Sequence, residues 1–167
     1  MKEVKLEELK LNPIEMIGKE WMLINTKTNT EMNSMTASWG GMGHLWNKDV
    51  IFLFVRPQRY TKKLIDQKNV KVSVSFFSGE HKKEMGYLGT ATAYTEHDKL
   101  KKCGLTVLEQ DGVFTFEEAT VTLEVKKLYQ QTLLEECFLD KETDNNAYPK
   151  HDYHDLYVCE IERVFVK

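Results

Sequence analysis

The apolar run VIFLFV at residues 50–55 constrains the fold more than any other stretch of the chain. Six consecutive apolar residues of mainly β-branched and aromatic type are typical of a strand that is covered on both faces. Pro57 follows closely and should end the strand, because proline has no N–H to donate to a neighbour. The run is far shorter than the ~20 residues that a membrane-spanning helix needs. We therefore expect a buried strand and no membrane span.

Further strands are expected along most of the chain. Residues 70–77 read VKVSVSFF, and this alternation directs the apolar side chains to one face and Lys71, Ser73 and Ser75 to the other. The segments expected to be strands are 21–25, 50–55, 70–77, 86–94, 120–129 and 155–166. Two short helices are expected, over 60–67 with Thr61 in an N-cap-like place, and over 98–103. Six or seven strands with few helices predict a mainly β fold, a small barrel with helical decoration.

Length, charge and cysteine content narrow the class of protein. The 167 residues contain no repeat and no linker, which predicts one domain over residues 1–167. A net charge of −3 argues against a general nucleic-acid binder. Three cysteines, widely spaced and without a CxxC pair, predict neither a disulfide framework nor a zinc site. These features favour a reducing, cytoplasmic location without a signal peptide.

Two arginines follow the 50–55 strand, in the stretch RPQRYT. Arg56 ends the strand, Arg59 lies in the turn, and Thr61 opens a helix whose first N–H groups have no partner within the helix. Guanidinium groups, a hydroxyl and a helix start at one strand end form a good receptor for phosphate. The simpler alternative is a loop with two solvated arginines.

A second candidate region precedes that strand. Residues 33–39, NSMTASW, carry small side chains that leave backbone N–H and C=O groups within reach of a flat heteroaromatic ring. The alternative is a hairpin arm rich in Ser and Thr, with Trp39 and Trp46 in the core. A ring-binding end and a phosphate-binding end on elements joined by one strand predict a phosphorylated aromatic cofactor.

The remaining polar residues are expected to be structural or solvated. His151 and His154 point to opposite faces if their segment is a strand, so no metal site is predicted. Lys99, Lys101 and Lys102 are interpreted as a solvated helix face, and Cys103 as a packed side chain.

The stretch 33–61, NSMTASWGGMGHLWNKDVIFLFVRPQRYT, resembles the flavin reductase-like family and is closest to its flavoredoxin-type branch. That branch shows an N-x-M-T-A-S-W-G-G-x-G-x-L-W segment followed by V-R-P-x-R-Y-T. The closing segment YHDLYVCEIE is similar to the family's last strand, and the resemblance runs from about Trp21 to Ile161. It implies an FMN-binding split β-barrel, Greek-key-like, with a few short helices, that forms a homodimer.

The resemblance also implies a set of site residues. The backbone of residues 33–39 would face the flavin ring and ribityl chain, the turn 56–61 would hold the phosphate, and residues 75–77 would pass the ribityl side. The flavin-binding residues so implied are Asn33, Ser34, Met35, Thr36, Ala37, Ser38, Trp39, Arg56, Arg59, Tyr60, Thr61, Ser75, Phe76 and Phe77. His154 would lie near the nicotinamide of an electron donor.

Three functions remain open at this point. The resemblance favours a flavin reductase or NAD(P)H-dependent oxidoreductase, with FMN as cofactor and NADH or NADPH as donor. The main alternative is a flavoredoxin-like electron carrier that holds FMN tightly and serves a protein redox partner; a third is a modified barrel that binds haem or another ring. Residues 89–97 replace the Ser-Gly-Arg loop of the related branch, which keeps the donor open, and Cys159 replaces a glycine in the last motif.

Overall fold

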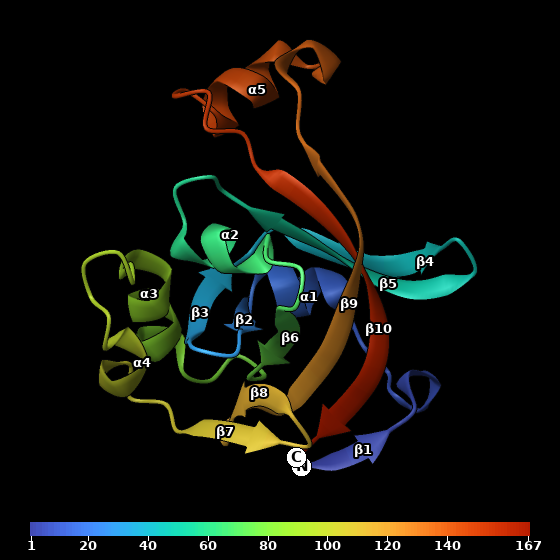
Figure 1. The fold of residues 1–167 in the computed structure, drawn as a ribbon. Helices are drawn as coiled ribbons and strands as arrows, with labels where there is room; N and C mark the ends of the chain where they lie inside the picture. Colours follow the sequence, from blue (N-terminus) through green and yellow to red (C-terminus); the bar gives the residue numbers. More distant parts are fainter.

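The computed structural model describes residues 1–167, and antiparallel strands make up most of its regular secondary structure (Figure 1). The main sheet has the order β3-β2-β6-β9-β10-β5-β4, with β1 paired to β10, and β7 and β8 form a separate hairpin. The strands are β1 Lys2–Val4, β2 Met22–Lys27, β3 Met32–Ala37, β4 Gly40–Leu45, β5 Lys48–Val55, β6 Lys71–Phe76, β7 Val107–Gln110, β8 Val113–Phe116, β9 Val121–Thr132 and β10 Asp155–Val166. The predicted mainly β class is confirmed.

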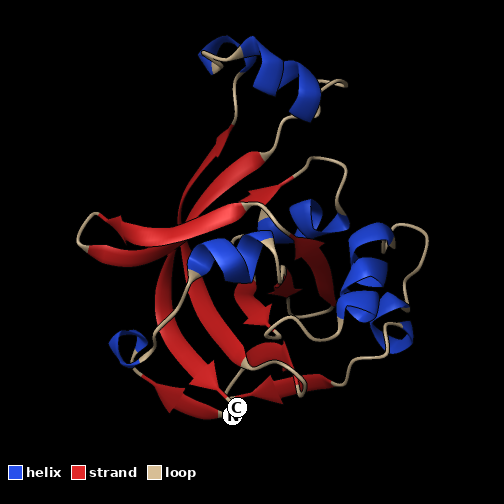
Figure 2. Cartoon of the chain, turned by 180° about the vertical axis from the view of Figure 1, so that it is seen from behind, coloured by secondary structure: helices blue, strands red, loops and turns tan.

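The helices are short and lie around the sheet (Figure 2). They are the 3₁₀ turns Leu6–Glu8 and Glu135–Cys137 and the α-helices α1 Pro13–Gly18, α2 Tyr60–Ile65, α3 Lys82–Thr90, α4 Lys99–Lys102 and α5 Lys141–Ala147. None of them has the length and apolar character needed to cross a membrane.

The strand predicted over residues 86–94 is wrong, because most of this segment belongs to helix α3 and the turn after it. Met85 and Leu88, three residues apart, lie on one helix face and are both fully buried in a core cluster with Phe77 and Phe116. Their helical spacing outweighs the local alternation GYLGTATAY, whose glycines suggested entry into a strand.

Strand β5 is less covered than its apolar run predicts. Val50, Leu53 and Val55 are fully buried, whereas Phe52 and Phe54 are only half-buried. By contrast, both faces of β6 are buried, because the β7–β8 hairpin covers the serine face. Ser75 Oγ lies 2.9 Å from Thr115 Oγ1 of β8.

Residues 133–154, here called the arm, leave the sheet between β9 and β10 and extend away from it, with α5 at the top of Figure 1. Within the arm, Phe138, Tyr148 and Tyr153 pack on one another, with the two tyrosine rings 4.7 Å apart. A single cation of the main body joins the arm through several contacts: Arg56 pairs with Asp152 at 2.5 Å and donates to the Ala147 carbonyl at 3.0 Å. The arm is therefore held next to the end of β5.

Candidate functional site

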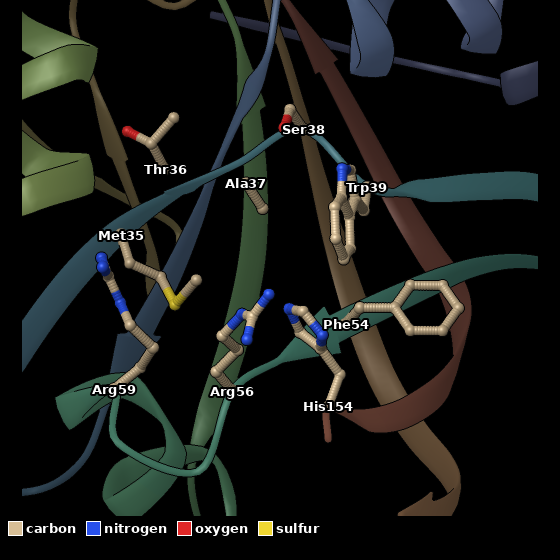
Figure 3. A pocket seen from close by; sticks show the side chains of 9 residues that line it. All are labelled: Met35, Thr36, Ala37, Ser38, Trp39, Phe54, Arg56, Arg59 and His154. Carbon is tan, nitrogen blue, oxygen red and sulfur yellow. The ribbon is translucent and has the colours of Figure 1, made fainter. Parts of the chain in front are cut away.

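A cavity of about 190 Å³ lies where β3, β5, the turn before α2 and the base of the arm meet (Figure 3). The residues that line it are Met35, Thr36, Ala37, Ser38, Trp39, Phe54, Arg56, Arg59 and His154. All of them except Phe54 are residues that the sequence predicts for the site. Phe54 reaches the cavity because it is on the half-buried face of β5, a signal that a continuous apolar run conceals.

The other predicted residues do not line the cavity. They are Asn33, Ser34, Tyr60, Thr61, Ser75, Phe76 and Phe77. Ser34 and Ser75 are fully buried and both bond the side chain of Asn25, at 2.7 and 2.8 Å. Phe76 and Phe77 are core residues. These side chains build the strands beneath the site.

Thr61 does not cap helix α2. The N-cap position is Arg59, and Thr61 is buried inside the first turn, where its Oγ1 accepts a hydrogen bond of 2.8 Å from Asn33 Nδ2. Asn33 Oδ1 is the one buried side-chain polar atom of the chain without a hydrogen-bond partner. Such a group in a native protein is costly and usually marks a function or a missing partner.

The first end of the cavity is formed by backbone and aromatic rings. Strand β3 is at the edge of the sheet, so the N–H and C=O groups that face away from β2 have no strand partner. Trp39 is 48% exposed and Trp46 is 56% exposed, so the alternative that places both in the core is wrong. The indole of Trp39 instead lies 5.1 Å from the imidazole of His154, across the cavity mouth.

Arg56 lines the cavity but is already engaged by the arm. Its guanidinium lies 5.2 Å from the ring centre of Tyr148 and 5.8 Å from that of Trp39, in addition to its ion pair with Asp152. That pairing lowers the pKa of the Asp152 carboxyl. A guanidinium neutralised in this way has less charge to offer a phosphate. The sequence assigns both arginines to the phosphate, whereas in the structure Arg56 binds the arm and only Arg59 is without a carboxylate partner.

Two cations form the positive end of the site: Arg59, which lines the cavity, and Lys99, which lies behind the lining and beside Arg59. Arg59 donates to the Gly89 and Leu88 carbonyls at 2.5 and 3.3 Å, and Lys99 Nζ donates to those of Ala91 and Leu88 at 2.8 and 3.4 Å. Neither cation has a carboxylate within 4.0 Å. Lys99 is buried and Arg59 is half-buried. Charges removed from water are normally paired, so two adjacent cations without a carboxylate make this end of the cavity a candidate anion site.

The interpretation of Lys99 as part of a solvated helix face is wrong, since its side chain is 2% exposed. Burial, and after it the charge of Arg59, lowers the pKa of Lys99 to about 8. The available sequence signal is the spacing to Cys103, which follows four residues later on the same helix face and is also buried. Lys101 and Lys102 are exposed, as expected.

Because its pKa is lower in the folded protein than the ordinary 10.5, Lys99 gives stability an identifiable pH dependence. Between about pH 8 and 10.5 the unfolded chain holds this proton while the folded chain releases it, so stability rises with pH. We expect the free energy of unfolding of the wild type, measured relative to Lys99→Met, to rise through this window. Urea denaturation at several pH values tests this, with Lys101→Met as the exposed control; parallel curves for wild type and Lys99→Met would contradict it.

His154 is buried at 8% exposure and neutral at pH 7. Burial, followed by the charge of Arg56, lowers its pKa to about 4. Its Nδ1 lies 2.8 Å from the hydroxyl of Tyr148. No group of three or more His, Cys, Asp or Glu side chains in the chain could hold a metal ion.

Comparison with known proteins identifies the fold. No family model and no curated protein matches the chain. Among solved structures, an FMN-binding domain of a flavin reductase-like enzyme from Shewanella baltica aligns with a TM-score of 0.69 at 14% identity, over 99% of this chain and 76% of that one. Flavoredoxin of Desulfovibrio vulgaris aligns at 0.66 and 21% identity, over 88% and 69%.

An FMN-binding protein from Thermus thermophilus with bound p-hydroxybenzaldehyde also aligns, with a TM-score of 0.65 at 19% identity over 88% of this chain and 71% of that one. At these identities the likeness is one of fold. The chain has the split-barrel fold of FMN-binding flavin reductase-like proteins and flavoredoxins, as the resemblance implies.

Proposed function

We propose that the protein binds FMN at this site and acts as an NAD(P)H-dependent flavin reductase or oxidoreductase. One observation carries the proposal: a cavity bounded by the edge strand β3 and an exposed indole has the half-buried Arg59 at its other end, and no carboxylate neutralises this guanidinium. The buried Lys99 lies beside Arg59, and both donate to the Leu88 carbonyl. The fold shared with FMN-binding proteins supports it.

The residues present fit FMN. Arg59 would hold the phosphate dianion, with the charge of Lys99 behind it, and the edge of β3 at Ala37 and Ser38 would hydrogen-bond the ring. The cavity, about 190 Å³, is smaller than the ~300–1,000 Å³ of typical ligand pockets, so part of the bound FMN would lie outside it.

Bound FMN supplies the capacity to accept a hydride and pass on electrons. The protein residues bind and orient. Trp39 and Phe54 exclude water from one side of the cavity, and neutral His154 offers a hydrogen bond without adding charge. No side chain needs to act as a general base.

The cofactor released from the protein by heat is expected to be FMN rather than FAD. Arg59 and Lys99 suit a terminal phosphate with two charges, whereas a bridged pyrophosphate would need further room for adenosine. Mass analysis of the released cofactor tests this, and FAD as the sole species would overturn it.

The second candidate function is an electron carrier with a protein redox partner. It is favoured by residues 89–97, which replace the loop of the related branch. The carbonyls of Gly89 and Ala91 accept hydrogen bonds from Arg59 and Lys99, so this segment supports the positive end of the site. An electron carrier does not need the segment to bind a nicotinamide. Stopped-flow reduction by NADH and by NADPH separates the functions. A reductase is reduced rapidly by at least one of them, and a carrier slowly by both.

We also propose that the protein is a homodimer. Trp46 is 56% exposed at the β4–β5 turn and has a positive φ of 54° that is unfavourable for its bulk. Its ring lies edge-on to that of the exposed Tyr129, at 6.2 Å between centres. An exposed aromatic pair of this kind is typical of an interface. Light scattering is expected to give a dimer mass, and Trp46→Asn, which suits the positive φ, should weaken the dimer. A monomer with flavin bound would contradict the proposal.

A further inference from the structure

The arm supplies a buried tyrosine directly behind the cavity histidine. Tyr148, the residue that follows α5, is 5% exposed, and its hydroxyl lies 2.8 Å from Nδ1 of His154. Its ring meets that of Trp39 edge-on at 6.4 Å and carries the Arg56 guanidinium over its face. The motifs discussed above assign no role to Tyr148.

The direction of this hydrogen bond follows from what else the hydroxyl can reach. The structure gives the Tyr148 hydroxyl no partner other than His154. If His154 donated from Nδ1, the phenol proton would remain buried without an acceptor, which is costly. If Tyr148 donates, both groups are satisfied. A neutral imidazole carries one proton, so that proton is then on Nε2.

The second ring nitrogen of His154, Nε2, is the one that can contact a ligand in the cavity. His154 is among the residues that line it, and Figure 3 shows its imidazole between Trp39, Arg56 and Phe54. Because Nδ1 is directed to the arm, Nε2 is available to a ligand. Without the Tyr148 hydroxyl on Nδ1, the two neutral tautomers of His154 would compete, and only one of them presents an N–H donor to the cavity.

We propose that Tyr148 is a positioning residue, whose hydroxyl fixes His154 in the tautomer that presents an Nε2–H donor to the cavity. The donor recognises a carbonyl oxygen or unprotonated ring nitrogen of the cofactor or of its hydride donor. This last step depends on the proposed flavin function, whereas the tautomer does not.

The tautomer is measured first in the wild-type protein without added ligand. Histidine labelled with ¹⁵N is observed by NMR at pH 7, and His154→Gln assigns the signal. The proposal expects the proton on Nε2 and an accepting Nδ1. A proton on Nδ1, or an even mixture, overturns it. If the tautomer is as expected but the protein binds no flavin, Tyr148 keeps its role and the flavin proposal fails.

Tyr148→Phe then removes the hydroxyl and keeps the ring, with Tyr153→Phe as the control. Tyr153 is also an arm tyrosine and donates to Asp144 at 2.8 Å, away from His154. In Tyr148→Phe we expect mixed tautomers and flavin reduction slower by about fivefold, the equivalent of one neutral hydrogen bond, at unchanged FMN affinity. The control Tyr153→Phe should change neither the tautomer of His154 nor the rate of flavin reduction. An unaltered tautomer and rate in folded Tyr148→Phe overturn the proposal, and if that variant does not fold the wild-type spectrum decides.

Discussion

Replacing Arg59 with alanine is expected to weaken FMN binding about 10- to 150-fold. A hydrogen bond from a charged donor contributes roughly 1.5–3 kcal/mol, and its loss translates into that range of dissociation constants. Arg59 is placed to make such a contact because it lines the cavity, is half-buried and has no carboxylate partner; this partial burial lowers its pKa. FMN fluorescence titration of wild type and variant measures the effect.

Two controls make the Arg59 result interpretable. Arg59→Lys should recover only part of the affinity, because an ammonium lacks the planar fork of the guanidinium. Since Arg59 also bonds the end of α3, the thermal stability of each variant is measured without flavin. Unchanged affinity in folded Arg59→Ala would place the phosphate elsewhere, with Arg56 as the next candidate.

Replacing His154 with phenylalanine is expected to slow flavin reduction by NAD(P)H by up to about a hundredfold. Phenylalanine keeps a flat ring beside Trp39 but removes the nitrogen that would orient the hydride donor, and loss of positioning can cost this much in rate. The FMN dissociation constant should change little, because the phosphate end of the site is separate. Stopped-flow reduction and FMN titration are measured on the same preparations.

His154→Gln provides the matched comparison. The glutamine amide can accept a hydrogen bond from Tyr148 and still donate one to a ligand in the cavity. Flavin reduction should therefore be faster in His154→Gln than in His154→Phe. A loss of thermal stability in His154→Phe without any change in the rate of flavin reduction would show that His154 only helps to form the cavity wall and does not position the hydride donor. It would then be removed from the site.

The sequence predicts the part of the site that is continuous in the chain. Residues 35–39 and Arg59 meet at the cavity because β3, the β4–β5 hairpin and the turn before α2 follow one another closely. A short path between elements leaves few ways to arrange them, so local patterns and the family motifs are sufficient here.

What the sequence could not predict are contacts made across the chain. The pairing of Arg56 with Asp152 joins the end of β5 to the arm, and the burial of Lys99 depends on carbonyls that only helix α3 brings together. Because residues 86–94 were expected to be a strand, these carbonyls could not be foreseen. Phe54 was missed for a related reason: a continuous apolar run does not tell which of its side chains faces a cavity.

The visible absorption spectrum of the purified protein, before and after addition of FMN, tests the central claim most directly. We expect the two absorption bands of flavin, either already present or gained with a stoichiometry near one FMN per chain, and a clear loss of affinity in Arg59→Ala. A Soret band would identify a haem protein instead. A colourless wild-type protein that leaves the spectrum and fluorescence of added FMN unchanged would contradict the account.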